Sequence, residues 1–211
     1  MRHVEDDSDL ECWLWLHGSE ALIGLRLSDA TMRHRSYKHE HLPASLRPTV
    51  AAAMAWLAGP KDDDAVLDPM CGAGTLVIER ALLAPYGTLA GGDISPDAVG
   101  MAKRNAGFAG IRATWAAWDA RALPLPDGSH SCLLSNLPFG KQIGNLTTNV
   151  ELYTALAREF HRVATPGAPL VTLTSDAALW DSTQREAGWR IEKKVVAVVL
   201  GQPATIFVAR R

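Results

Sequence analysis

The chain has 211 residues, of which 47% are apolar and 21% are charged, a composition typical of a globular domain with its own core. Lysine and arginine total 21 against 23 acidic residues, and the net charge of -2 excludes the strongly basic balance of a self-sufficient nucleic-acid binder. The three cysteines, Cys12, Cys71 and Cys132, are widely spaced, which argues against a zinc site and a disulfide framework. The amino terminus is acidic and the sequence has no long apolar run, which argues against a signal peptide and a membrane span. We therefore expect a soluble cytoplasmic protein.

The amino-terminal part carries two short apolar alternations, residues 11–16 and 21–27, separated by a polar segment with one glycine. This pattern predicts a β-hairpin. The stretch 26–47 is locally basic, with five Arg or Lys and three His against two acids. Such a stretch can face RNA or form an ordinary solvated surface, and the sequence leaves both open; the candidates for RNA contact here are Arg33, Arg35 and Lys38.

The rest of the chain alternates short apolar runs with helical periodicity, which predicts a parallel sheet covered by helices on both faces. A helix is expected from Pro48 to the Gly59-Pro60 stop. The expected strands are 65–67, 88–92, 113–116, 131–135 and 169–174, and the expected helices are 75–83, 96–106 and 152–163. Two β-rich runs, 190–200 and 205–209, have no helix between them and predict a closing antiparallel hairpin.

The strongest local signal is a glycine-rich turn between the first expected strand and helix of this sheet, VLDPMCGAGT. Gly72 and Gly74 allow close backbone approach to a ligand, and the new helix offers free N–H groups. A dinucleotide fingerprint would need a third glycine where Val77 stands, and Asp68 at the strand end disfavours a pyrophosphate. The turn therefore favours a ligand with a cationic group.

Two further acids follow the next two expected strands. Asp93 lies 19 residues beyond Gly74 and suits the two hydroxyls of a ribose, and Asp119 suits the exocyclic amine of an adenine. Carboxyl ends of parallel strands meet at one edge of an open sheet, so we expect Asp68, Asp93 and Asp119 to share a site. S-adenosylmethionine carries the matching sulfonium, ammonium, ribose and adenine groups.

The fourth expected strand runs into Asn136-Leu137-Pro138-Phe139 at the same sheet edge. The amide oxygen of Asn136 and the backbone carbonyl of Leu137 can accept the two hydrogens of a planar amine, which favours the positive charge that develops on its nitrogen during methyl transfer. Pro138 fixes the turn, and Phe139 offers a face on which an extruded base can stack. This tetrapeptide is the candidate catalytic centre.

These motifs, together with the segments LYTAL and LGQPATIFVARR, resemble the class I S-adenosylmethionine-dependent methyltransferases, specifically the catalytic domain of THUMP-associated RNA guanine-N2 methyltransferases. The resemblance covers roughly residues 30–211. It implies an α/β, Rossmann-like fold with a seven-stranded, mostly parallel sheet in the order 3-2-1-4-5-7-6. It also implies methylation of a guanosine N2 amine, with tRNA as the expected substrate, and a division into a tail and hairpin, 1–30, and a methyltransferase domain, 31–211.

The resemblance further implies that the loop around residues 41–46, similar to an HPAxL segment of the family, closes over the methionine end of the cofactor. The expected cofactor-binding residues are Pro43, Ala44, Leu46, Asp68, Pro69, Cys71, Gly72, Ala73, Gly74, Thr75, Asp93, Ile94, Asp119, Ala120 and Asn136. Lys141 joins the expected RNA contacts. No metal is expected. Family members normally carry a THUMP module before this domain, so we expect a separate RNA-binding module or partner to supply the docking.

Alternatives from the same chemistry remain open at this point. Guanine N2 in ribosomal RNA, adenine N6, cytosine N4 and protein glutamine are all planar amines, although NLPFG is more similar to the guanine-N2 group than to enzymes with N-P-P-Y. A non-catalytic cofactor-binding subunit is the alternative from another class. The identity of the methylated nucleoside would separate these readings.

Overall fold

The computed structural model of the protein describes residues 11–26, 34–42, 45–138, 146–199 and 201–211. The chain divides into two compact units, Met1–Arg35 and Ser36–Arg211. The first unit contains the expected hairpin, formed by antiparallel β1 (Glu11–His17) and β2 (Glu20–Arg26). Its Trp13 and Trp15 rings stack with centroids 5.5 Å apart.

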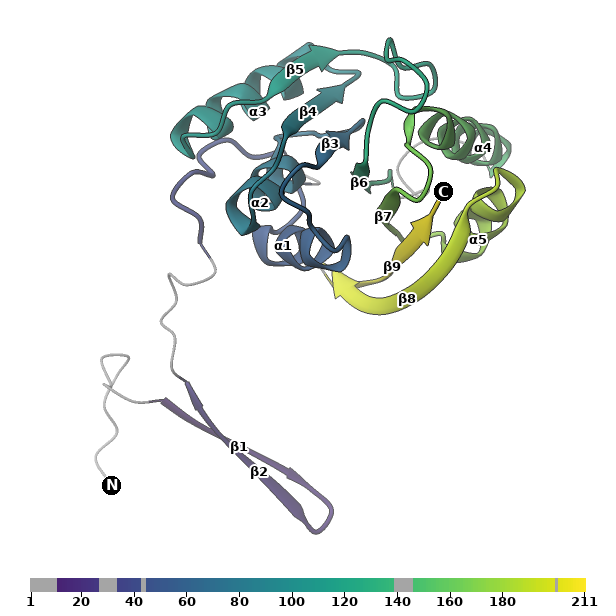
Figure 1. The fold of residues 1–211 in the computed structure, drawn as a ribbon. Coiled ribbons are helices and arrows are strands. Elements are labelled where there is room, and N and C mark those ends of the chain that lie inside the picture. The colour runs from purple at the N-terminus through teal and green to yellow at the C-terminus, as the bar shows by residue number, and fades with distance from the viewer. Residues whose placement is uncertain (1–10, 27–33, 43–44, 139–145, 200) are drawn as a thin grey trace. The chain divides into compact units, whose positions relative to one another are not determined.

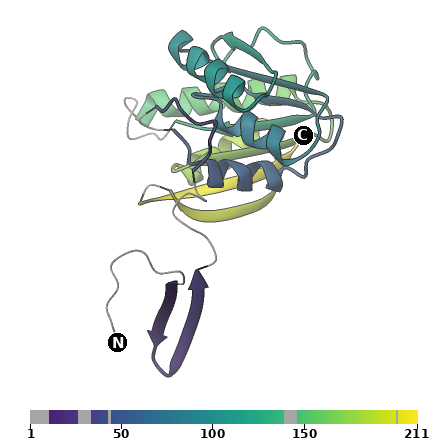
Figure 2. The same ribbon diagram turned by 90° about the vertical axis from the view of Figure 1, so that its left-hand side faces the viewer.

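The second unit is built on one seven-stranded sheet in the order β5-β4-β3-β6-β7-β9-β8 (Figure 1). Counted from the first strand of this sheet, that order is the expected 3-2-1-4-5-7-6. The five strands of the parallel part are β3 (Ala65–Asp68), β4 (Thr88–Asp93), β5 (Thr114–Ala117), β6 (Cys132–Asn136) and β7 (Pro169–Thr174). The antiparallel hairpin of β8 (Arg190–Val199) and β9 (Gln202–Arg210) runs along one edge of the unit (Figure 2), as predicted.

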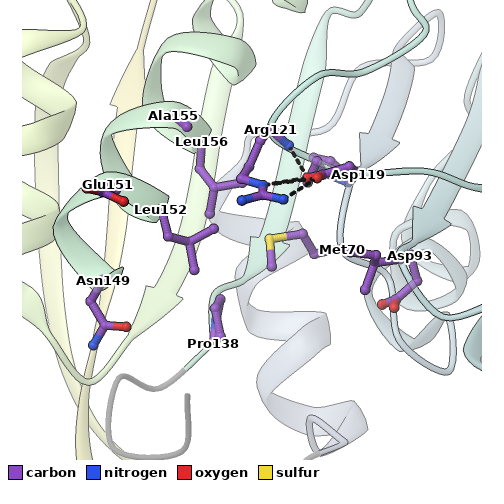
Figure 3. A pocket seen from close by; sticks show the side chains of 13 residues that line it. Met70, Asp93, Asp119, Arg121, Pro138, Asn149, Glu151, Leu152, Ala155 and Leu156 are labelled. Carbon is purple, nitrogen blue, oxygen red and sulfur yellow. Dashed lines mark hydrogen bonds and ion pairs between the residues drawn. The ribbon is translucent and has the colours of Figure 1, made fainter. Parts of the chain in front are cut away.

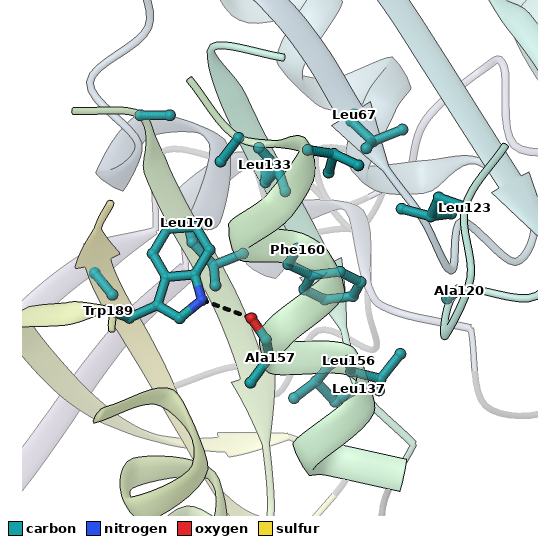
Figure 4. Packing of buried hydrophobic residues seen from close by; sticks show 14 of the residues in the cluster. Leu67, Ala120, Leu123, Leu133, Leu137, Leu156, Ala157, Phe160, Leu170 and Trp189 are labelled. Atoms are coloured by element: carbon teal, nitrogen blue, oxygen red, sulfur yellow. Dashed lines mark hydrogen bonds between the residues drawn. The ribbon is translucent and has the colours of Figure 1, made fainter. Parts of the chain in front are cut away.

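Five helices of the described part of the chain cover the two faces of this sheet. On one face lie α1 (Pro48–Leu57), α2 (Thr75–Leu83) and α3 (Pro96–Phe108), and on the other lie α4 (Leu146–Val163) and α5 (Ala177–Glu186) (Figure 1). Adjacent residues of β3 face opposite cores, as the period of two requires. Val66 belongs to the buried cluster that includes residues of α1 and α2, whereas Leu67 belongs to the cluster that includes Phe160 of α4 (Figure 4). The architecture is thus three-layered, with the apolar strands buried on both faces.

Two helices differ from expectation. α4 begins at Leu146, six residues before the predicted start, because its first turns are polar and lack apolar periodicity. α5 was not predicted at all. It is short, its N-cap Asp176 accepts a hydrogen bond from the N–H of Leu179, and Trp180 anchors it by donating to Thr172 Oγ1 at 2.7 Å. That anchor depends on a tertiary contact that the local pattern does not encode.

β9 starts at Gln202, three residues before the predicted boundary, and therefore contains Pro203. Proline normally interrupts a strand because it lacks an N–H. Here Pro203 pairs with Val198 of β8 and lies beyond Thr205, the last β9 residue paired with β7. The missing donor therefore costs no hydrogen bond to the centre of the sheet.

None of the helices in the described part of the chain is long and apolar enough to cross a membrane.

Candidate active site

A pocket of about 500 Å³ opens where the parallel strands end (Figure 3). One side is formed by the loops that follow β3, β4 and β5 and includes Met70, Asp93 and Asp119. The other side is formed by Pro138, which follows β6, and by residues of α4 such as Leu152. Two of the three predicted acids, Asp93 and Asp119, and Pro138 of the predicted tetrapeptide therefore border one cavity, whereas its α4 residues were not predicted as site residues.

The glycine-rich turn begins the construction of this site. Gly72 and Gly74 have φ values of 50° and 82°, which a residue with a side chain rarely adopts. A Cβ at Gly74 would lie 3.0 Å from both Ala102 Cβ and the Trp115 ring, so α3 and β5 also require glycine here. α2 starts directly afterwards at Thr75, so its first N–H groups have no helical partner, and Pro69 and Met70 before the turn line the pocket.

Asp93 ties this turn to the end of β4. Its Oδ2 accepts the N–H of Gly72 at 3.0 Å, and its Oδ1 accepts the N–H of Ser95 at 3.0 Å. A carboxylate has about four acceptor positions, so two remain for ligand hydroxyls. Ile94 next to it is 72% exposed at the pocket wall and offers an apolar surface to a planar ring.

Asp68 lies under the turn and not in the pocket wall. It is 1% exposed, and its Oδ1 accepts the N–H of Met70 at 3.1 Å. Burial is the main cause that raises the pKa of Asp68 to about 8, and the nearby negative charge of Asp93 adds to it. The same burial, with two acids nearby, raises the pKa of the Cys71 thiol, so this cysteine stays neutral and serves as a small packing residue.

Asp119 stands at the pocket as expected, but it is already engaged by Arg121. Its Oδ1 accepts the Arg121 N–H at 2.9 Å, and its Oδ2 accepts Arg121 Nη2 at 2.6 Å (Figure 3). These hydrogen bonds lower the pKa of Asp119. Arg121 itself lines the pocket and was missed in the sequence, because nothing in the pattern WDAR separates a site arginine from a surface one.

β4 is enclosed by two tryptophan rings because it presents two successive glycines. A Cβ at Gly91 would lie 2.4 Å from the Trp115 ring, and one at Gly92 would lie 2.1 Å from the Trp118 ring. The Trp118 indole donates to the Pro69 carbonyl at 3.0 Å. This bond links the loops after β3 and β5 directly below Asp93 and Asp119.

The tetrapeptide predicted as the catalytic centre begins at the last residue of β6, and its Pro138 lines the pocket. The N–H of Leu137 donates to the Leu173 carbonyl at 2.9 Å, which continues the pairing with β7 beyond the strand end. The Oδ1 atom of Asn136 is buried and has no hydrogen-bond partner among the described residues. A buried acceptor without a donor is costly in a resting protein, and here it lies two residues before Pro138 of the pocket wall, where a ligand could supply the donor. Phe139 and Lys141 lie outside the described residues.

The segment before α1 packs against the back of the glycine-rich turn. Buried Asn105 of α3 organises it: its Oδ1 accepts the N–H groups of His39 and Glu40, and its Nδ2 donates to the Ala73 carbonyl at 3.0 Å. A Cβ at Gly72 would lie 3.5 Å from Leu42. The segment 36–42 thus lies beside the turn, and it includes the first two residues of the loop 41–46 that the resemblance expects over the cofactor.

The remaining predicted residues are distributed as follows. Lys38 does not present a free ammonium, because its Nζ donates to the Leu46 carbonyl at 2.6 Å and burial lowers its pKa to about 8. Leu46 belongs to the buried cluster that includes residues of α1 and α2. Arg35 is half-buried. Arg33, Pro43 and Ala44 lie outside the described residues. Among the described side chains, no group of His, Cys, Asp or Glu could hold a metal ion.

The sheet order, the glycine-rich turn and the acids that follow β3, β4 and β5 define a Rossmann-like methyltransferase fold. The family described as "RMKL-like, methyltransferase domain" matches residues 35–203, and the chain belongs to this family. The sequence-based recognition of a methyltransferase related to the THUMP-associated enzymes is therefore confirmed.

Named relatives carry the comparison further. The tRNA (guanine(6)-N(2))-methyltransferase THUMP3 of Bos taurus is 31% identical over 219 residues, covering 96% of this chain and 43% of the relative. The U6 snRNA (guanine-N(2))-methyltransferase THUMPD2 of Bos taurus is 32% identical over 170 residues, covering 80% of this chain and 32% of the relative. The crystal structure of TrmN from Thermus thermophilus superimposes with a TM-score of 0.77 at 27% identity, and the match covers 96% of this chain and 60% of the TrmN chain. The chain thus spans less than half the length of the two Bos taurus relatives and 60% of the TrmN chain.

Proposed function

We propose that this chain transfers a methyl group from S-adenosylmethionine to the exocyclic N2 amine of a guanosine in RNA, with tRNA as the expected substrate. The observation that carries the proposal is the buried Oδ1 of Asn136, which has no partner among the described residues and lies two residues before Pro138 of the pocket wall. An amine hydrogen is the donor that this atom needs. The names of two relatives, both guanine-N2 methyltransferases, support the choice of amine.

The pocket fits the proposed cofactor. Its volume of about 500 Å³ lies within the usual range for such ligands, and its acids match the groups to be held. The remaining acceptor positions of Asp93 would hold the ribose hydroxyls, and the glycine-rich turn above Asp68 would face the cationic methionine end. Asp119 would accept the adenine amine once Arg121 has moved aside. When bound, S-adenosylmethionine supplies an electrophilic methyl group.

The chain's own groups would act on the guanine amine. That nitrogen is a poor nucleophile, because its lone pair is delocalised into the ring. Asn136 Oδ1 and the Leu137 carbonyl would accept its two hydrogens and so stabilise the positive charge that grows on nitrogen as the new bond forms. The backbone that carries both acceptors is held before reaction by the hydrogen bond from the Leu137 N–H to the Leu173 carbonyl. Phe139 is proposed to stack on the base.

The two relatives are named for different RNAs, tRNA and U6 snRNA. We propose that docking comes from a separate RNA-binding module or partner. The net charge of -2 and the inward hydrogen bond of Lys38 support this, since few phosphate contacts are left to Arg33, Arg35 and Lys141. We place the activity in the cytoplasm, where free Cys12, Cys71 and Cys132 stay reduced.

Digestion and mass analysis of RNA after incubation with isotope-labelled S-adenosylmethionine tests the proposal. N2-methylguanosine is the expected product; N6-methyladenosine, a methylated cytosine or labelled protein would establish one of the alternatives. Asn136→Ala should lower the single-turnover rate roughly 10²-fold, while cofactor affinity changes less than about twofold. Gln184→Ala is the matched control, because Gln184 of α5 is another buried amide without a partner in the described chain. Full activity of Asn136→Ala would refute the assigned centre.

A further inference from the structure

The hydroxyl of Tyr153 lies at the centre of a buried hydrogen-bond chain behind the catalytic turn. Tyr153 belongs to α4 and is 1% exposed. Its Oη lies 2.9 Å from the Pro138 carbonyl oxygen and 2.8 Å from Thr174 Oγ1. Thr174 ends β7, so this one hydroxyl joins α4, β7 and the exit of β6.

The direction of each hydrogen bond in this chain is fixed by chemistry. The Pro138 carbonyl can only accept, so the single Tyr153 proton must point to it. Thr174 must then donate its own proton to the Tyr153 oxygen. Thr174 Oγ1 in turn accepts the N–H of Asp176 at 3.0 Å. All four groups are satisfied in one orientation, and such chains reinforce one another.

The carbonyl that Tyr153 holds is two residues from the proposed catalytic acceptor. Proline has no N–H, so the carbonyl is the only backbone hydrogen-bonding group by which Pro138 can be held. The N–H of Leu137 is fixed on one side by Leu173, and the Pro138 carbonyl is fixed on the other by Tyr153. Together these two bonds set the direction of the backbone between Asn136 and the base site.

Tyr153 is itself held rigidly. Its ring meets the Trp180 ring edge-on, with centroids 5.3 Å apart at 84°, and the Trp180 indole donates to Thr172 Oγ1 at 2.7 Å. Neighbouring Leu152 and Leu156 line the pocket, whereas Tyr153 packs behind it. Burial also raises the pKa of Tyr153, so the hydroxyl keeps its proton.

We propose that Tyr153 is a positioning residue for methyl transfer: through the Pro138 carbonyl it sets the orientation in which Asn136 and Leu137 receive the amine. It does not touch substrate or cofactor. This inference rests on the proposed function and assigns a role to the LYTAL segment of α4.

Tyr153→Phe tests the proposal, because it deletes the hydroxyl and keeps the ring against Trp180. The single-turnover rate with saturating RNA and cofactor should fall about 10- to 100-fold, as for a small misplacement of reacting groups, with the Kd of the cofactor unchanged. The single-turnover rate of Thr174→Val should fall less than that of Tyr153→Phe, because Tyr153 can still donate its proton to the Pro138 carbonyl. Trp189→Phe is the control: it removes another buried aromatic donor to a backbone carbonyl, that of Ala157 at 2.9 Å (Figure 4).

Hydrogen exchange gives a readout that does not require activity. In Tyr153→Phe the Leu137 amide should exchange about tenfold faster, while it stays protected in Trp189→Phe. A purely structural role predicts instead that rate loss follows thermal stability across all three variants. Unchanged exchange at Leu137, or a full rate in Tyr153→Phe, overturns the proposal. Absence of N2-methylguanosine from the wild-type reaction would overturn the proposed function, and the exchange result would still decide whether Tyr153 holds the turn.

Discussion

Replacement of Asp93 by alanine gives the sharpest test of the cofactor site. The carboxylate holds the N–H groups of Gly72 and Ser95 and has two acceptor positions left for a ribose. Alanine removes the ligand contacts and also releases the glycine-rich turn. Hydrogen bonds to a charged group contribute about 1.5–3 kcal/mol, so the Kd for S-adenosylmethionine or its demethylated product should rise roughly 10- to 150-fold.

Isothermal titration calorimetry measures this change directly. Asp97→Ala is the matched control, because it removes the same charge from the first turn of α3, four residues away and exposed to solvent. The Kd of Asp93→Asn should lie between those of wild type and Asp93→Ala, because the amide oxygen can still accept one N–H group while the other N–H faces the amide NH₂. Circular dichroism establishes that each variant is folded. If Asp93→Ala bound either ligand within twofold of wild type, the assignment of Asp93 to the ribose would be wrong.

Three further predictions concern other groups of the same domain. Asp64→Ala should destabilise the fold by about 3–5 kcal/mol in urea unfolding, because Arg80, which is fully buried and 2.9 Å from Asp64, would lose its counter-charge; an equally stable variant would contradict this. The pKa of Asp68 is about 8 in the folded protein and near 3.8 in the unfolded chain, so between these pH values only the folded state keeps the proton. The free energy of unfolding should therefore fall as pH rises from about 4 to about 8, and Asp68→Asn should flatten this pH profile, measured without ligand. Arg121→Ala should tighten cofactor binding by a few-fold at low salt and by less at high salt, because Asp119 no longer has to be freed; weaker binding would show that Arg121 contacts the ligand.

The sequence predicted those features that depend on local pattern. The strand ends at Asp68 and Asp93 and the tetrapeptide at Asn136 follow apolar runs, and a parallel sheet brings such ends together. Gly72 and Gly74 were identifiable because few other residues adopt their backbone angles. Local pattern therefore located the side of the candidate pocket that the strand ends form, but not the side that α4 forms.

Features that depend on distant contacts could not be predicted in this way. Asn105 reaches the Ala73 carbonyl across 32 positions, and Tyr153 reaches Pro138 across 15, with no periodicity to mark either residue. Lys38 was grouped with the RNA contacts because of its charge, yet its ammonium turns inward to Leu46. α5 was missed for the same reason, since its anchor is the contact between Trp180 and Thr172.

The two tryptophan rings over β4 have a consequence for how this protein tolerates change. In a saturation mutational scan, Gly91 and Gly92 should be as intolerant as the acid that follows them, although they have no part in the chemistry and their φ angles are ones that any residue can adopt. Each glycine is intolerant because of the tryptophan ring that it contacts, Trp115 for Gly91 and Trp118 for Gly92. Alanine at Gly92 should regain function when Trp118 is exchanged for a smaller side chain, and alanine at Gly91 should respond in the same way to Trp115. Natural variation at these positions should therefore occur as coupled substitutions, in which the glycine and its ring change together.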